Sequence, residues 1–215
     1  MTLDLFDPAE LPERQALAPG AVLLRRWALP SEAALLEGIE AVVAAAPWRH
    51  LVTPGGLRMS VAMTNCGPLG WVSDRSGYRY QATDPESGRP WPAMPAAFLA
   101  LARGAAAQAG FPGFEPDACL VNRYVPGARL SLHQDRDERD HRHPIVSVSL
   151  GLPAVFLFGG QARGEPTQRV PLQHGDVVVW GGPSRLRYHG VLALQEGRHP
   201  LLGAQRVNLT LRRAG

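Results

Sequence analysis

Hydrophobic and polar positions change their spacing about half-way along the chain. In the first half, two stretches carry apolar residues at helical spacing: residues 31–45, which Ser31 can cap, and residues 95–109. In the second half, short alternating segments separated by glycine and proline predict strands. These segments are residues 119–125, 145–150, 154–158, 168–172, 176–180, 187–192 and 206–212. Helices followed by many short strands indicate an α+β protein whose second half is a sandwich or barrel.

The rest of the first half contains two further predicted strands. Residues 21–27 form one of them, after a loose arm at residues 1–20. Residues 57–64 form the other, with Met59, Val61 and Met63 on one face, after a turn at Thr53-Pro-Gly-Gly.

Residues 65–95 are irregular and rich in Gly, Pro, Ser and Asp, yet they carry aromatic side chains. The aromatic residues are Trp71, Tyr78, Tyr80 and Trp91. Disordered linkers avoid aromatic residues, so we interpret the segment as an ordered lid, with a short hairpin around Gly77. Alternatively, the rings only pin the loop to the core, and we favour that alternative for Trp91.

Composition fits a globular protein inside the cell. The chain has 215 residues, of which 45% are hydrophobic, and no apolar run is long enough to span a bilayer. Its acidic start lacks the basic and apolar regions of a signal peptide. Cys66 and Cys119 are expected to be packed free thiols in a reducing compartment. We therefore expect a cytoplasmic protein without a membrane partner, and a monomer because no assembly stripe is visible.

The charge of the chain is slightly basic. The net charge is +3, and all 22 basic residues are arginine. A basic balance weakly favours a polyanionic partner, and arginine can bind phosphate bidentately. GC-rich coding also explains the absence of lysine and is the explanation that we favour, although composition alone does not separate the two.

His133-Gln-Asp135 is the strongest candidate for chemistry. On an extended strand, residues two positions apart project to the same side, so an imidazole and a carboxylate can share one cation. His189 can complete a 2-His-1-carboxylate triad, which leaves three metal positions open and suits non-haem Fe(II). A second pair, His174-Gly-Asp176, includes a glycine turn, and we interpret it as structural.

The last predicted strand alternates strictly. Its polar face carries Arg206, Asn208, Thr210 and Arg212. Asn122 and Tyr124 likewise share one face of an earlier strand. An outward polar face is one explanation. The other is the inward face of a small barrel, where such donors could bind a carboxylate.

Together these motifs resemble the AlkB family of Fe(II)/2-oxoglutarate-dependent dioxygenases. The resemblance rests on Asn122-Arg-Tyr-x-Pro-Gly, His133-Gln-Asp135, His189-Gly and Arg206-x-Asn208-x-Thr210-x-Arg212, in this order and spacing. It continues through Ser-Val-Ala-Met-Thr-Asn-Cys-Gly, Pro-Trp-Pro-Ala-Met-Pro and His-Gly-Asp-Val-Val-Val-Trp-Gly-Gly, and so covers nearly the whole chain.

The resemblance implies a fold, a metal and a co-substrate. The expected fold is a double-stranded β-helix (jelly roll) core with an N-terminal nucleotide-recognition lobe and two flanking helices. A single domain over residues 1–215 would comprise an extension and lid up to about residue 115 and a catalytic core from about 116. Fe(II) would be held by His133, Asp135 and His189, and O2 would use an open position. The expected 2-oxoglutarate contacts are Asn122, Tyr124, Arg206, Asn208 and Arg212.

The resemblance also implies an activity and a substrate. The family oxidatively demethylates 1-methyladenine and 3-methylcytosine in DNA, single-stranded by preference and also double-stranded, and releases formaldehyde, succinate and CO2. The expected substrate contacts are Thr53, Met63, Trp71, Tyr78, Asp137 and Arg163. The other charged residues after Asp135 are expected at the surface, namely Arg136, Glu138, Arg139 and Asp140. Two alternatives stay open: the same chemistry on RNA or a protein side chain, and a binding module without catalysis.

Overall fold

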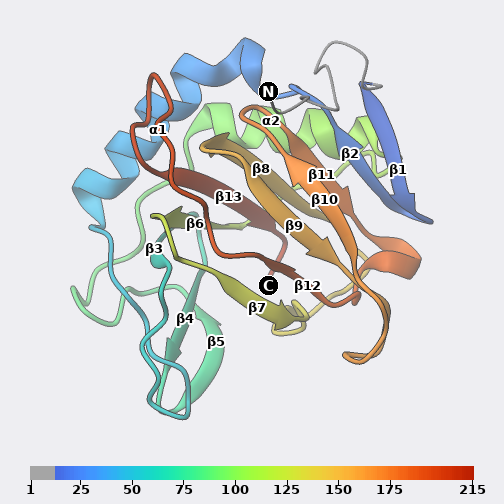
Figure 1. The fold of residues 1–215 in the computed structure, drawn as a ribbon. Helices are drawn as coiled ribbons and strands as arrows, with labels where there is room; N and C mark the ends of the chain where they lie inside the picture. Colours follow the sequence, from blue (N-terminus) through green and yellow to red (C-terminus); the bar gives the residue numbers. More distant parts are fainter. Residues whose placement is uncertain (1–12) are drawn as a thin grey trace.

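Two antiparallel sheets form the core of the computed structural model, which describes residues 13–215 (Figure 1). The larger sheet has the strand order β1-β2-β11-β8-β13-β6-β3. Its strands are β1 (Arg14–Ala18), β2 (Ala21–Leu24), β3 (Ala62–Cys66), β6 (Ala118–Tyr124), β8 (Ile145–Gly151), β11 (Val177–Trp180) and β13 (Arg206–Arg212). The smaller sheet, in the order β10-β9-β12-β7, consists of β7 (Leu130–His133), β9 (Ala154–Phe158), β10 (Gln168–Leu172) and β12 (His189–Val191).

Alternation along the strands divides the apolar residues between two cores. Val207, Leu209 and Leu211 of β13 pack with the helices α1 (Glu32–Ala45) and α2 (Ala96–Gln108), which cover one face of the larger sheet (Figure 1). The opposite face of that sheet packs on the smaller sheet through a second cluster that includes Phe156 and Trp180. Polar positions of β13 therefore point between the two sheets and away from solvent.

The predicted lid contains a two-stranded hairpin. Strands β4 (Gly70–Asp74) and β5 (Gly77–Gln81) pair, and Gly77 has φ +124°, a conformation that side chains disfavour. Trp91 is buried, donates from Nε1 to the carbonyl of Gln81 at 3.0 Å, and lies against Gly70. The interpretation of Trp91 as a pin for this segment is thus confirmed.

Three segments differ from the prediction. The strand expected at 57–64 begins only at Ala62, because residues 49–52 meet residues 58–63 through isolated bridges in place of a regular ladder. The strand expected at 21–27 ends at Leu24, because the Arg26 backbone N–H turns to bond Asp176. The arm expected at 1–20 contains β1, and residues 1–12, with the acidic start, lie outside the described residues.

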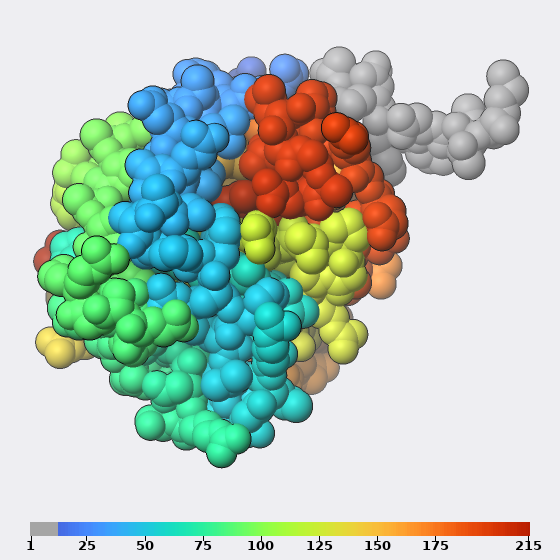
Figure 2. Space-filling view, turned by 90° about the vertical axis from the view of Figure 1, so that its left-hand side faces the viewer, coloured from blue at the N-terminus to red at the C-terminus, as the bar shows by residue number. Residues whose placement is uncertain are grey.

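The segment after β12 reaches back to the turn before β7. Backbone hydrogen bonds join Gly127 N to Leu194 O at 2.8 Å and Leu194 N to Ala128 O at 3.0 Å. In Figure 2 the red residues after β12 lie beside the yellow residues of this turn, and the cyan and green-blue residues of the 49–60 segment and the hairpin form the lower end. The larger sheet takes strands from both sides of residue 115, and the division into extension and core at that point stays a prediction.

Two smaller expectations concern cysteines and membranes. Cys66 and Cys119 are both buried and unbonded, and they lie opposite each other in the β3–β6 pair, so the packed free thiols are confirmed. Among residues 13–215, none of the helices is long and apolar enough to cross a membrane.

Candidate metal centre

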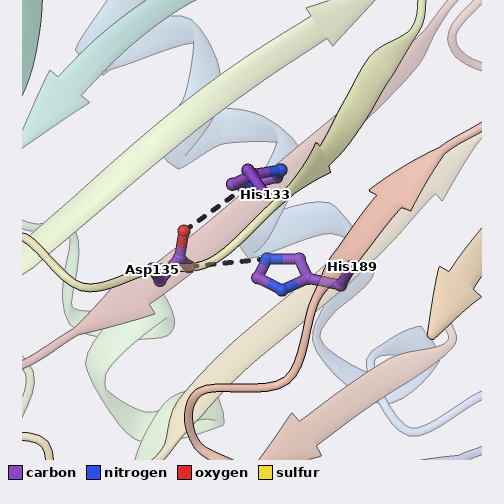
Figure 3. A group of neighbouring side chains, drawn as sticks. All are labelled: His133, Asp135 and His189. Atoms are coloured by element: carbon purple, nitrogen blue, oxygen red, sulfur yellow. Dashed lines mark ion pairs between the residues drawn. The ribbon is translucent and has the colours of Figure 1, made fainter. Parts of the chain in front are cut away.

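Strand pairing brings the three predicted metal ligands together. His189 lies directly opposite His133 in the antiparallel β12–β7 pair, and Asp135 follows two residues after His133, just beyond the end of β7 (Figure 3). His133 Nε2 is 3.4 Å from Asp135 Oδ1, and His189 Nε2 is 3.7 Å from Asp135 Oδ2. One ligand atom from each residue lies within 4.8 Å of the others, an arrangement that could hold a metal ion.

Both imidazoles are oriented by carbonyl groups on their outer side. His133 Nδ1 is 2.9 Å from Ser131 O, and His189 Nδ1 is 3.0 Å from Arg187 O. A hydrogen on Nδ1 can donate to a carbonyl in each case, and Nε2 of each ring faces Asp135. Burial, with a further contribution from His133, lowers the pKa of His189 to about 4. A neutral imidazole is the form that binds metals, so the site is prepared for a cation at neutral pH.

The carboxylate of Asp135 is held ionised. Burial raises its pKa, but Arg212, His189 and His133 more than offset that effect and hold the pKa well below its ordinary value. Arg212 donates to Asp135 Oδ2 from Nε at 2.9 Å and from Nη2 at 2.6 Å. Two imidazoles and one carboxylate, with one side chain (His133) still 32% exposed, match the triad that binds non-haem Fe(II).

The polar face of β13 lies inside the molecule. Arg206, Asn208, Thr210 and Arg212 are between 1% and 6% exposed. The explanation as an outward polar face is therefore wrong for this strand, and the inward alternative is the one that the structure supports.

Arg206 is a buried cation without a carboxylate partner among residues 13–215. It donates from Nε and Nη2 to Ser149 Oγ at 3.1 and 2.7 Å, and its guanidinium lies 4.9 Å above the Tyr124 ring centre. Nη1 has no hydrogen-bond partner in the described part of the chain, and burial lowers the pKa of this arginine. Buried charges are costly unless paired, so the site favours an anion at this position.

The two asparagines of the predicted co-substrate set tie strands together. Asn122 Nδ2 donates to Asn208 Oδ1 at 3.3 Å across the β6–β13 pair. Asn208 Nδ2 donates onward to Ser147 Oγ at 2.9 Å and to Val148 O at 2.8 Å in β8. The side-chain oxygen of Asn122, Oδ1, is buried without a partner in the residues that the structure describes. Contacts of either asparagine with 2-oxoglutarate stay a prediction.

The structure brings together three of the predicted substrate residues. The rings of Trp71 and Tyr78 stack with centres 5.5 Å apart and an interplanar angle of 14°. Trp71 Nε1 donates to Asp137 Oδ2 at 2.9 Å, which links the hairpin to the segment just after the metal carboxylate.

The other three predicted substrate residues lie on other segments of the chain, and Met63 belongs to the apolar cluster against which Trp71 packs. Met63 is buried in β3 opposite Asn122, and Thr53 accepts a bond from Leu57 N in the turn before it. Arg163 is exposed, with its guanidinium 5.3 Å above the half-buried Tyr188 ring.

Sequence reasoning missed a buried carboxylate beside the triad. Glu138 was expected at the surface, but it is only 5% exposed, so that expectation is wrong. It forms ion pairs with Arg185 at 3.0 Å and Arg212 at 3.3 Å, and accepts a hydrogen bond from Tyr80 at 2.8 Å. These partners come from three separate elements, and no local pattern around Glu138 announces them. Arg136 and Arg139 are exposed, as expected.

The second H-x-D pair supports the fold. Asp176 accepts hydrogen bonds from Arg25, from the Arg26 backbone and from Gln173 N, all at 2.9 Å. His174 Nδ1 accepts from Gly151 N at 2.8 Å, and its Nε2 contacts Glu32.

Comparison with known proteins identifies the family. Residues 20–212 match the profile of the 2OG-Fe(II) oxygenase superfamily. The chain is 59% identical over 213 residues to "Alpha-ketoglutarate-dependent dioxygenase AlkB" of Escherichia coli (strain K12), covering 99% of this chain and 98% of that protein. The chain belongs to the AlkB family of 2OG-Fe(II) oxygenases.

Further relatives and solved structures agree with this assignment. An AlkB homolog of Caulobacter vibrioides is 49% identical over 187 residues, covering 86% of this chain and 83% of that protein. The solved structure of OsALKBH1 superposes with a TM-score of 0.79 at 29% identity, covering 93% of this chain and 99% of that one. The predicted α+β jelly roll is thereby confirmed.

The family depends on Fe(II) and 2-oxoglutarate, and the residues present fit both. The triad supplies two imidazole nitrogens and one carboxylate for iron. Nη1 of Arg206, which has no hydrogen-bond partner among residues 13–215 and is enclosed between the sheets, fits a carboxylate of the co-substrate.

Proposed function

We propose that this protein is an Fe(II)/2-oxoglutarate-dependent dioxygenase that demethylates 1-methyladenine and 3-methylcytosine in DNA, preferably single-stranded, in the repair of alkylation damage. The carrying observation is the triad of His133, Asp135 and His189, whose ligand atoms lie within 4.8 Å of one another beside an aromatic hairpin. When bound, Fe(II) and 2-oxoglutarate activate O2 and oxidise the N-methyl carbon, with release of formaldehyde, succinate and CO2.

Two arginines divide the work of co-substrate binding. Arg206, assisted by Tyr124 and Asn208, would bind the far carboxylate of 2-oxoglutarate, because its Nη1 is enclosed in protein and has no partner within residues 13–215. Arg212 and Asn122 would lie nearer the metal end. Arg212 already donates twice to Asp135, so it also keeps that carboxylate oriented toward the two histidines.

The hairpin would hold a base that has left the helical stack. Trp71 offers a ring face supported by Tyr78 behind it, and base–aromatic stacking contributes about 1–3 kcal/mol per base. Asp137 lies within hydrogen-bond distance of Trp71 Nε1, and its negative charge suits a methylated base that carries positive charge. Thr53, Met63 and Arg163 would complete the nucleotide contacts, with exposed Arg163 facing a phosphate.

We assign the protein to the cytoplasm, as a monomer acting on nucleic acid. The net charge is +3 and every basic residue is arginine, which favours such a polyanionic partner. RNA as the main substrate is the competing assignment, since stacking on Trp71 reads a base and ignores the sugar.

One assay tests the triad, the co-substrate and the substrate class together. A 3-methylcytosine single-stranded DNA oligomer is incubated with Fe(II), 2-oxoglutarate and the protein, beside a His133→Ala control and an RNA oligomer of the same sequence. We expect formaldehyde and succinate from the wild-type protein on DNA and neither product from the variant. Succinate without demethylation would contradict the substrate class, and no turnover by iron-loaded protein would contradict the enzyme itself.

A further inference from the structure

Glu138 connects the metal carboxylate with the base-binding hairpin. It lies three residues after Asp135 and contacts Tyr80 on β5, Arg185 after the 3-10 turn Gly182–Ser184, and Arg212 at the end of β13. Its side chain is only 1% exposed. An unpaired charge at this depth would be strongly destabilising, so the three polar partners are needed to keep the Glu138 carboxylate buried.

Two arginines carry the connection from Glu138 to Asp135. Arg212 pairs with Glu138 through Nε at 3.3 Å and grips the side chain of Asp135 through Nε and Nη2. Arg185 pairs with Glu138 at 3.0 Å and donates from Nη1 to the backbone carbonyl of Asp135 at 2.7 Å. Asp135 is therefore held at both its side chain and its main chain by the two cations that Glu138 fixes. Two carboxylates and two guanidiniums balance, so the position of each depends on the others.

Tyr80 carries the connection from Glu138 to the hairpin. It lies directly opposite Trp71 in the β4–β5 register, and its hydroxyl donates to Glu138 Oε1 at 2.8 Å. Burial raises the pKa of Tyr80 well above its ordinary value, so the hydroxyl keeps the proton that it donates. Trp71 bonds the neighbouring Asp137, and the hairpin is thus attached at two adjacent points to the segment that follows the metal carboxylate.

We infer that Glu138 is a positioning residue that couples the position of the β4–β5 hairpin to that of the metal carboxylate. The coupling runs through Tyr80 on one side and through Arg185 and Arg212 on the other. The inference rests on the proposed function, in which Asp135 holds the metal and the hairpin holds the base. Metal binding at Asp135 should therefore order the hairpin, and an ordered hairpin should favour metal binding. Without the contact between Tyr80 and Glu138, metal binding should no longer order the hairpin.

The test uses Mn(II), a redox-silent probe for the triad, with 2-oxoglutarate and the full-length protein. Mn(II) affinity and the amide hydrogen exchange of residues 70–81 are measured for the wild type, Tyr80→Phe, Glu138→Gln and the double variant. We expect Mn(II) with 2-oxoglutarate to slow exchange of the hairpin roughly tenfold or more in the wild type. In Tyr80→Phe the affinity should stay within about threefold, since only a hydroxyl is lost, while most of the added protection disappears. Glu138→Gln should lose the protection and also bind Mn(II) roughly tenfold more weakly, because Arg185 and Arg212 keep excess charge beside the site.

Arg79→Gln is the matched control on the same hairpin. Its ion pair with Asp74, at 2.8 Å, stays within the hairpin, so the response to Mn(II) should equal that of the wild type. If the double variant loses no more protection than Glu138→Gln alone, Tyr80 and Glu138 act in one path, as inferred. Additive losses, or wild-type protection in both single variants, would overturn the coupling. If Glu138→Gln fails to fold, the hydrogen-exchange responses of Tyr80→Phe and Arg79→Gln to Mn(II) are compared instead. This comparison still tests the coupling, because Tyr80→Phe keeps the ring and removes one hydroxyl.

The failure of this inference is distinguishable from the failure of the proposed function. Mn(II) binding and hydrogen exchange require no nucleic acid, so an error in the substrate class leaves the result unaffected. Normal Mn(II) binding with unaltered hairpin responses would overturn the coupling alone. Absence of Mn(II) binding by the wild-type protein would overturn the metal role of Asp135 and the coupling with it.

Discussion

Two H-x-D pairs in this chain have the same spacing and different surroundings. At His133-Gln-Asp135 the imidazole Nε2 faces Asp135, and a second strand places His189 directly opposite. At His174-Gly-Asp176 the imidazole bonds Gly151 and Glu32, and the carboxylate accepts three hydrogen bonds. Chemistry therefore depends on whether the neighbouring elements leave the donor atoms free and convergent, and the three-residue pattern alone does not decide it.

The largest expected effect comes from removing the charge of the first carboxylate. Asp135→Asn should lower succinate release about a thousandfold or more, because an amide cannot replace the anionic ligand of Fe(II). Turnover and bound iron are measured on the same preparation. Asp176→Asn is the control with equal chemistry and should keep its iron, so equal iron loss in both variants would remove the distinction between the pairs.

The second carboxylate should control stability. Asp176→Asn leaves Arg25 without its anion, in a pair whose side chains are 10% and 0% exposed, and breaking such a pair costs about 3–5 kcal/mol. Denaturant unfolding of the metal-free protein measures the loss. A change in the free energy of unfolding below about 1 kcal/mol would mean that the hydrogen bonds and ion pair of Asp176 do not stabilise the fold. The structural role assigned to the second H-x-D pair would then be wrong.

The sequence allowed prediction of regular elements and of the triad, but not of the charge cluster around it. Strands β9, β10 and β13 match their predicted limits, because alternation is a local property of each segment. The start of the strand predicted at residues 57–64 was wrong, because residues 49–52, which lie beside it, form isolated bridges and no regular ladder.

Glu138 was missed for a different reason. Its burial is decided by Tyr80, Arg185 and Arg212, which are far apart in the chain and converge only in the folded protein. The inward direction of β13 was left open at the level of sequence, since one alternating pattern serves both a solvent face and a cavity.

The third prediction concerns pH and belongs to the first pair. The pKa of His189 is lowered from 6.5 to about 4 in the folded protein, so between these values the unfolded chain binds more protons. Stability of the metal-free protein should therefore be complete above about pH 6.5 and fall by about 3 kcal/mol as the pH drops to about 4. Unfolding midpoints across this range measure it, with His189→Gln as the reference. A slope in His189→Gln as steep as in the wild type would assign the effect to other groups.

The finest comparison is between two arginines: Arg206 is buried without a carboxylate partner among residues 13–215, and Arg25, whose side chain is 10% exposed, has one. Arg25 is paired with Asp176 at 2.9 Å, whereas Arg206 has Ser149 and the Tyr124 ring as its partners in residues 13–215. Arg206→Gln should raise the KM for 2-oxoglutarate roughly thirtyfold, equivalent to about 2 kcal/mol, with little loss of stability, since no anion is left unpaired. Arg25→Gln should do the reverse: lower stability and an unchanged KM. Steady-state kinetics and unfolding of the two variants side by side check this, and a KM change shared by both would show that it reflects the loss of a buried cation in general.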